Sequence, residues 1–428
     1  MKAANSVSNM SLAHEITVDN DFHLQKLELP DNSLHHVVKE MMHKAFWDVL
    51  REELNQKPPE YNRALTLLAE VKEWLLSLLL PHQTRTQQEI KEKLDIDLIQ
   101  QQAEEETLDF RQYSQYIISL MARLCAPSRD EKIRELTALS DIVDIFKGIF
   151  ETLELMKLDM ANFTIRQIRP QIAACSVEYE RNKFEEYLKV TPDGLRNTRE
   201  WLYRNRSVQS ASAASSSTDT LHGISSILIS SFMELLKWDE TNPWPETVAM
   251  DEGRFAELRN KLASLEILSS VALVTFSQNI GSLQTSTDFR KIFKEHVTVV
   301  LGQARTAEEL KEVLPNVIVQ VFKDVNEGLK NQDTDELNSE SKEFITGQIM
   351  ELRYPTSRIR QLLHSRILDF LQRVISSDTA QPTQIPAGLS LFREELALIA
   401  GQFARLVSHN RAVFAHHYAD LIQKHCLE

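Results

Sequence analysis

The stretch that decides the fold reads LMKLDMANFTIRQIRPQIAACSVEYERNKFEEYL and spans residues 155–188. Its apolar residues recur at helical spacing, so it predicts a long helix with one face in the core. Pro170 lacks a backbone N–H and predicts a kink near Arg166. The apolar row consists of Ala161, Ile165, Ile168, Ile172 and Tyr179.

A second row of side chains on this helix is polar and consists of Asp159, Asn162, Arg166 and Arg169. Their spacing of i, i+3, i+7 and i+10 places them on one stripe beside the apolar face. Three interpretations stay open. The stripe is a buried polar network against a preceding helix over 128–158, a contact surface for a partner protein, or an exposed surface with weak ion pairs of under ~1 kcal/mol each.

Composition extends the helical prediction to the whole chain. Ten glycines occur among 428 residues, about a third of the usual frequency of roughly 7%. Glycine supplies the positive φ angles of tight turns and phosphate-binding loops, so β-rich and nucleotide-cradling folds are disfavoured. Leu, Glu, Gln, Lys and Ala are abundant and favour helix. We expect an all-α fold, an irregular multi-helix array of two packed halves, because no repeat of fixed period is present.

The expected organisation has four parts. Residues 1–30 form an irregular N-terminal segment, and residues 31–206 form the N-terminal helical half. The sequence SVQSASAASSSTDT at 207–220 is rich in Ser and Ala and poor in large apolar residues, so it predicts a linker. Residues 221–428 form the C-terminal helical half.

Apolar periodicity and breaking residues place the individual helices. In the second half we expect helices over 222–239, 251–280, 286–303, 307–330, 337–352, 356–377 and 389–425. Two capping boxes, in which a hydroxyl and a carboxylate three residues apart satisfy the first amides, predict helix starts at Ser128 and at Thr306.

The predicted helix over 33–56 has an apolar row with a period near 3.5. The row consists of Leu34, Val38, Met41, Ala45 and Val49. His36, Glu40 and His43 share the opposite face, where two imidazoles and a carboxylate have ligand types that zinc accepts. A solvated polar face is the favoured interpretation.

Histidines also gather near the C-terminus, at His416, His417 and His425. Histidine near a helix C-terminus is stabilised by the helix dipole alone, so we predict no metal site. The chain contains no G-x-S-x-G elbow, no Walker loop, no G-x-G-x-x-G fingerprint and no H-E-x-x-H. We therefore predict a protein that is not an enzyme and has no cofactor.

Charge and cysteine usage restrict the class of partner and the compartment. The formal net charge of −14 opposes the electrostatic mechanism of nucleic-acid binding, so no nucleic-acid partner is expected. Cys125, Cys175 and Cys426 form no C-x-x-C pair and are expected to be free thiols. No apolar run reaches the ~18 residues of a membrane span, and the N-terminus lacks a signal-peptide pattern. We expect a cytoplasmic protein whose membrane association is at most peripheral.

Two arginine clusters interrupt the acidic background, and both include aromatic residues. Such clusters bind phosphate, RNA or an acidic partner helix, although arginine near a helix end is also ordinary capping. Arg204-Asn-Arg-Ser207 resembles a basophilic-kinase site, which makes Ser207 a candidate phosphosite. The arginines proposed for partner contact are Arg199 and Arg204 in the first cluster, and Arg353, Arg358, Arg360 and Arg366 in the second.

Several ordered phrases resemble the T-complex protein 11-like family. Besides the stretch at 155–188, they include LAHEITV, VVKEMMHKAFWDVL, PPEYNRAL, LCAPSRDEKIREL, LLKWDETNPWPETVAMDEGRF and SRILDFL. The resemblance covers nearly the whole chain from about Asn9. It implies cyclic-AMP and protein-kinase-A signalling, with sperm capacitation and motility in testis members, and cytoskeletal partners in others. The family has no catalytic residues to transfer.

The resemblance implies a non-catalytic helical adaptor or regulator in signal transduction, with a signalling kinase or cytoskeletal protein as partner. The alternative is a peripheral membrane protein that places an arginine cluster on anionic lipid. At ~1 kcal/mol per basic residue, that affinity would be marginal for so acidic a chain. The oligomeric state is not specified by the sequence.

Overall fold

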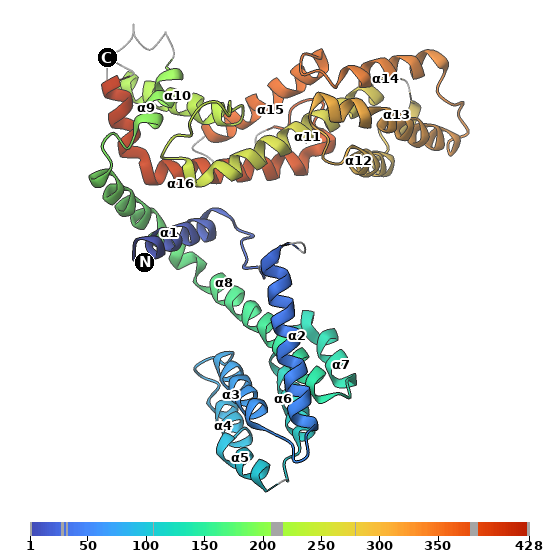
Figure 1. Ribbon diagram of the computed structural model, residues 1–428. Helices are drawn as coiled ribbons and strands as arrows, with labels where there is room; N and C mark the ends of the chain where they lie inside the picture. Colours follow the sequence, from blue (N-terminus) through green and yellow to red (C-terminus); the bar gives the residue numbers. More distant parts are fainter. Residues whose placement is uncertain are drawn as a thin grey trace. The chain divides into compact units, whose positions relative to one another are not determined.

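The computed structural model is all-α, as predicted, with no strand among the residues that it describes (Figure 1). These residues are 2–26, 30, 33–105, 107–206, 217–278, 280–376 and 384–425. Within them, no helix is both long enough and apolar enough to cross a membrane. Cys426 and Ser207 lie outside the described residues.

The chain divides into two compact units that do not coincide with the predicted halves. Unit 1 consists of Met1–Asp19 and Ala173–Glu428, and unit 2 is Asn20–Ile172. Helix α8 (Ile142–Val190) belongs to both, so the boundary falls inside a continuous helix just after Pro170. We expected the boundary at 207–220, of which 207–216 are not described. A long helix shared by two units has no change in composition to mark the division.

The N-terminal segment also differs from the expectation of an irregular structure. It forms helix α1 (Lys2–Val18) and belongs to unit 1. The apolar side chains of Ile16 and Val18 are buried, and His14 is buried beside them. A helix with so few apolar residues forms because its buried face packs in the tertiary structure, which is information that its own sequence lacks.

Unit 2 is built from short helices around the first part of α8. Its core includes Leu68, Met121, Phe146, Ile149 and Leu153, which are almost completely buried. The helices of this unit are α2 (Leu34–Asn55), α3 (Asn62–Ser77), α4 (Thr84–Lys93), α5 (Ile96–Glu104), α6 (Phe110–Leu124) and α7 (Asp130–Ala138).

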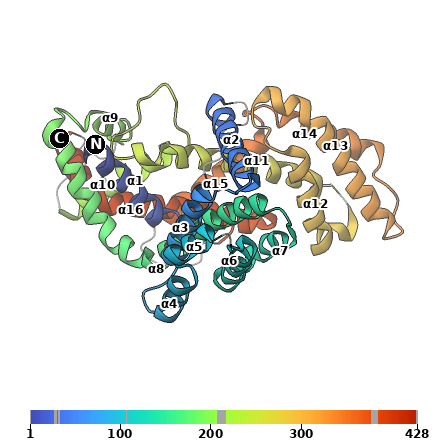
Figure 2. The ribbon, with the colours of Figure 1, turned by 60° about the horizontal axis from the view of Figure 1, so that its bottom comes forward.

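Unit 1 has a larger core in which aromatic rings from distant segments meet, among them Phe232, Phe255, Phe403 and Tyr418. Within it, α12 and α13 lie side by side, and α11 packs against α15 and α16 (Figures 1 and 2). Its later helices are α9 (Arg196–Arg204), α10 (Ser217–Leu235), α11 (Glu252–Phe276), α12 (Thr287–Leu301), α13 (Ala307–Lys330), α14 (Ser339–Glu351), α15 (Arg358–Ser376) and α16 (Arg393–His425).

The two predicted capping boxes have different outcomes. The box predicted at Ser128 is not formed, because α7 begins at Asp130 and its N-cap residue, Arg129, makes no side-chain capping hydrogen bond. Thr306 forms the complete box with Glu309 at the start of α13. The helix predicted over 128–158 is instead two helices, because α7 ends at Ala138 and α8 begins at Ile142. The Asp141 side chain accepts hydrogen bonds from the backbone N–H groups of Val143 and Asp144, and this cap starts a new helix.

The core face predicted for α8 is only partly buried. Ile165 is buried, but Ile168 is exposed, as is Phe163. Helix α8 remains helical through Pro170. The middle of this helix therefore has less apolar packing than the segment before it, where Phe146, Ile149 and Leu153 are all in the core of unit 2.

Candidate functional site

The polar stripe on α8 lies in unit 2, and its first member forms an ion pair with a residue of the same unit. Both Asp159 oxygens accept hydrogen bonds from the Arg129 guanidinium, each at 2.8 Å, and both side chains are about a quarter exposed. A bidentate pair of this kind fixes geometry as well as adding attraction. Asp159 therefore anchors the turn that precedes α7.

Two further stripe residues bind the backbone of the segment that follows α1. The Asn162 side chain accepts a hydrogen bond from the Leu24 N–H at 2.6 Å and donates one to the Leu24 carbonyl at 2.9 Å. Arg169 donates to the Phe22 carbonyl at 3.0 Å. These contacts support the internal interpretation of the stripe. Asp159 pairs with Arg129, which lies within the range 128–158 predicted as the preceding helix, whereas Asn162 and Arg169 bind the segment that follows α1.

Arg166, the remaining member of the stripe, is exposed, and its Nε donates at 3.4 Å to the Asn162 carbonyl. It lines a cavity of about 650 Å³ in unit 2, whose wall also includes Cys125. Burial raises the pKa of the Cys125 thiol, and its contact with Asp130 raises it further. A thiol held protonated is a poor nucleophile, so this wall is not suited to cysteine catalysis.

The second arginine cluster is not a single exposed patch. Arg360 is only 7% exposed and donates to Glu266 at 2.6 Å and to the Leu352 carbonyl at 2.9 Å. His364 also bonds Glu266, at 2.8 Å. Burial alone would raise the pKa of Glu266, but the contacts with His364 and Arg360 keep it below its usual value. Arg360 is therefore part of a buried ion pair inside unit 1.

The other arginines of this cluster have separate surroundings. Arg366 donates to the Ala387 carbonyl at 2.7 Å, and the Arg353 guanidinium lies 4.6 Å from the ring centre of Tyr354. Arg358 is exposed. The surface that remains for a partner is smaller than the sequence pattern indicated, because a helical spacing of arginines does not show which of them face the core.

The arginines of the first cluster make ion pairs within unit 1. Arg199 donates to both oxygens of Asp193 at 3.0 Å. Arg204 donates to Glu234 at 3.1 Å and lies over the ring of Trp238 at 5.3 Å. Partly exposed pairs such as these contribute little to stability.

The first half of α2 exposes the apolar row that the sequence predicted. Of this row, Leu34 is 75% exposed, and Val38 and Met41 are exposed as well. Val37 and Met42, which were not part of the predicted row, are also exposed. Only the second half of the helix packs in unit 2, where Leu50 is fully buried. Contiguous exposed apolar patches of this kind are uncommon on monomeric soluble proteins.

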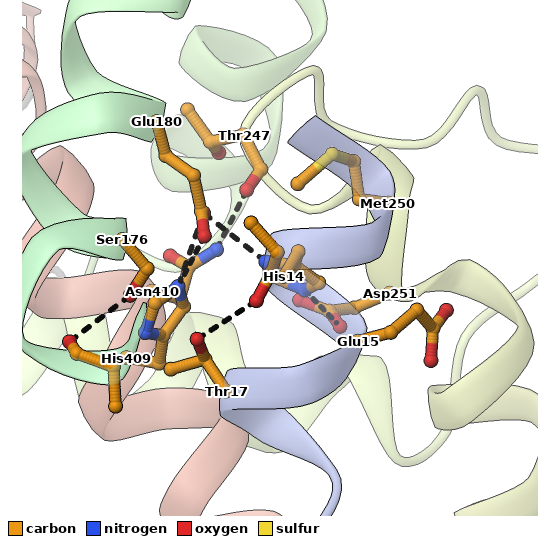
Figure 3. Close-up of polar contacts among 12 residues, drawn as sticks. His14, Glu15, Thr17, Ser176, Glu180, Thr247, Met250, Asp251, His409 and Asn410 are labelled. Carbon is orange, nitrogen blue, oxygen red and sulfur yellow. Dashed lines mark hydrogen bonds and ion pairs between the residues drawn. The ribbon is translucent and has the colours of Figure 1, made fainter. Parts of the chain in front are cut away.

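A second cluster, the histidine network of unit 1, was not predicted from the sequence (Figure 3). His14 of α1 lies between two carboxylates, with Nδ1 3.1 Å from Glu180 of α8 and Nε2 2.9 Å from Asp251. His409 of α16 donates to both Glu180 oxygens at 2.9 and 3.0 Å. Four segments distant in sequence meet at this network, and it fixes α1 in unit 1.

The two carboxylates of the network also determine the protonation state of His14. Ionised carboxylates only accept, so both His14 nitrogens must donate, and the ring is an imidazolium. Burial would lower the pKa of His14, but the hydrogen bonds and charges of Asp251 and Glu180 raise it to about 9. For Glu180, burial opposes ionisation, whereas the bonds from His14 and His409 lower its pKa. At neutral pH, His14 is therefore protonated and Glu180 is ionised.

Sequence reasoning had one signal for this network. His14, Glu180 and Asp251 all lie in phrases that carry the family resemblance, LAHEITV, VEYERNKF and AMDEGRF. Their distance in sequence hid the contact. The network is a buried cluster of ion pairs and hydrogen bonds, with the hydroxyls of Ser176 and Thr247 close to it (Figure 3).

These observations define an all-helical protein of two units, with a buried ion network in one and an exposed apolar helix in the other. The family model for T-complex protein 11 matches residues 12–423. With this match, and with the relatives below, the chain belongs to the T-complex protein 11 family, which confirms the resemblance.

The matches with three relatives extend over most of this chain and most of each relative. The chain is 36% identical over 444 residues to T-complex protein 11-like X-linked protein 1 of Homo sapiens, with 99% of this chain and 88% of that protein covered. It is 34% identical over 442 residues to the T-complex protein 11 homolog of Homo sapiens, covering 99% and 87%. It is 35% identical over 424 residues to T-complex protein 11 of Mus musculus, covering 94% and 74%. No solved structure matches the chain.

Proposed function

We propose that the protein is a non-catalytic helical adaptor that binds a partner protein through the first half of α2. The observation that carries this proposal is the exposed apolar row of Leu34, Val38 and Met41 on that helix. A helical segment of about twelve residues is marginal by itself in water, and most helical stability comes from packing of an apolar face. The row has the spacing that a second helix would bury.

The charges beside this row indicate the kind of helix that binds there. Residues 34–45 contain two lysines, three histidines and a single glutamate, on a chain whose net charge is −14. This local excess of basic groups favours an amphipathic helix with acidic flanks. It disfavours a second copy of α2, because two such faces would bring Lys39 and Lys44 near their equivalents.

The pathway that we propose is cyclic-AMP-linked signalling, with a protein-kinase-A subunit as the partner and the cytoplasm as the compartment. Its support is the resemblance to the T-complex protein 11 family, for which such a role is implied. Cytoskeletal association and a role in sperm function are further proposals, and they are also based on the resemblance to this family.

The test is affinity purification with mass spectrometry from cells that express the full chain. The double variant Val38→Asp/Met41→Asp places charges in the apolar row without touching a buried residue. The matched control is Val299→Asp/Val319→Asp, which changes two exposed valines on α12 and α13. We expect a kinase subunit with the wild type and the control, and at least a tenfold loss with the α2 variant.

Equal recovery by all three proteins would refute the α2 surface as the docking site. A change in oligomeric state on sedimentation, specific to the α2 variant, would assign the surface to self-association and contradict the adaptor proposal. Charge reversal of the second arginine cluster would not be a usable alternative test, because Arg360 is buried and its reversal would disrupt unit 1.

A further inference from the structure

Two adjacent histidines of α16 meet one carboxylate of α8 near the surface of unit 1. His416 Nε2 lies 3.1 Å and His417 Nε2 lies 3.2 Å from the same Glu185 oxygen, Oε1. The two imidazole ring centres are 3.8 Å apart. All three candidate ligand atoms lie within 4.8 Å of one another. Neighbouring side chains on a helix usually diverge, so this convergence requires both rings to turn toward Glu185.

The separations are those of ligands around a small metal ion. Zinc binds histidine nitrogen and carboxylate oxygen at about 2.0–2.1 Å, so two ligands at the tetrahedral angle lie about 3.3 Å apart. The two distances to Glu185 already approach this value. Only small side-chain movements would be needed for an ion to replace the proton that now links His416 to Glu185.

The hydrogen bonds of the cluster are incomplete. His416 donates to Glu185, whereas His417 Nε2 is buried and has no hydrogen-bond partner despite its proximity to the same oxygen. Buried polar atoms are nearly always satisfied, so each exception requires an explanation. A bound cation would supply the missing partner. The T-shaped contact of the His417 ring with Phe184, at 5.5 Å, holds that ring in place.

Access and charge also suit an ion. Glu185 and His416 are each more than 40% exposed, so an ion can enter from solvent. Asp420, one turn beyond His416, adds negative charge, while Lys189 and Arg181 oppose it. Arg181 is engaged by the carbonyls of Ala412 and Val413.

We propose that Glu185, His416 and His417 form a zinc site that joins the end of α8 to the end of α16. Three protein ligands leave one coordination position open for water or an external ligand. The sequence had indicated only that the helix dipole stabilises these histidines, because Glu185 is more than two hundred residues away. The histidine network around His14 is less suited to zinc, since both His14 nitrogens are already occupied by buried carboxylates.

The test is a calorimetric titration of the metal-free full chain with Zn²⁺ alone. A second titration uses Co²⁺, whose visible absorption reports its coordination geometry. We expect one Zn²⁺ per chain with micromolar or tighter affinity, and a Co²⁺ visible absorption typical of tetrahedral coordination. His416→Ala and Glu185→Gln should each weaken Zn²⁺ binding by at least about tenfold, because each removes one of three ligands. His43→Ala, which removes an exposed histidine of α2, should leave it unchanged.

Circular dichroism of each variant checks that the helices are intact, which is expected because Glu185 and His416 are partly exposed. Absence of saturable Zn²⁺ uptake by the wild type would overturn the proposal. So would uptake that is equally strong in the His416→Ala and Glu185→Gln proteins, since the ion would then be bound elsewhere.

Discussion

The substitution His14→Gln tests whether a buried imidazolium fixes α1 in unit 1. Glutamine keeps a polar side chain at the site but cannot carry the positive charge. It leaves Glu180 with His409 and leaves Asp251 with Arg254, which donates to it at 2.7 Å. The variant therefore removes one charge from the network and keeps a partner for each carboxylate.

The expected magnitude follows from the pKa of His14, which is about 9 in the folded protein, against 6.5 for an unperturbed histidine. Because the folded value is the higher one, its contribution to stability is complete below pH 6.5 and is lost as the pH rises through about 9. At ~1.4 kcal/mol per pH unit, the full contribution is about 3 kcal/mol. Because the pKa of Glu180 is lowered, its contribution to stability changes only in acid. Measurements at pH 6 and above therefore report the contribution of His14.

The assay is hydrogen exchange of residues 9–19, with protection factors corrected for the intrinsic rate at each pH. We expect the α1 amides of the wild type to lose about a hundredfold in protection between pH 6 and pH 9.5, which corresponds to about 3 kcal/mol. His14→Gln should be the less protected protein at pH 6 and should approach the wild type at pH 9.5. His43→Gln is the matched control. If the difference in protection between wild type and His14→Gln is the same at both pH values, a protonated His14 does not stabilise α1, and the reasoning is refuted.

Four further outcomes are expected. Arg360→Met should lower the free energy of unfolding by about 3–5 kcal/mol, because it leaves the buried Glu266 with one partner fewer. Arg358→Met is the control and should change this free energy by less than ~0.5 kcal/mol, and chemical denaturation measures both. Asn162→Ala should cost about 1–3 kcal/mol by leaving the Leu24 backbone without its partner, and limited proteolysis should then cut near residues 20–26 faster. Val38→Asp/Met41→Asp should remove partner recovery while Val299→Asp/Val319→Asp does not. His416→Ala should weaken Zn²⁺ binding and His43→Ala should not.

Much of the fold is predictable from the sequence, because low glycine content and helical periodicity act locally. The capping box at Thr306 and the helix over 307–330 are confirmed at the predicted residues. The division inside α8 is not predictable in this way, since a helix can pass between two cores without any change in its own periodicity. The helix formed by Lys2–Val18 depends on the partners of His14, which are distant in sequence.

The candidate sites show the same limit. The sequence placed Asp159, Asn162 and Arg169 on one stripe, and the structure adds that each binds a group of unit 2. It placed Leu34 and Met41 on one face of a helix, yet only tertiary contacts reveal that this face is exposed. Periodicity identifies which residues share a face, but it does not identify what that face contacts.

The measurement that tests the adaptor account most directly is hydrogen exchange of residues 34–45 with and without the purified kinase subunit recovered by the wild type. We expect fast exchange in the free chain and strong protection in the complex, restricted to the wild type and the Val299→Asp/Val319→Asp control. A complex that forms while residues 34–45 exchange as in the free chain would contradict the account.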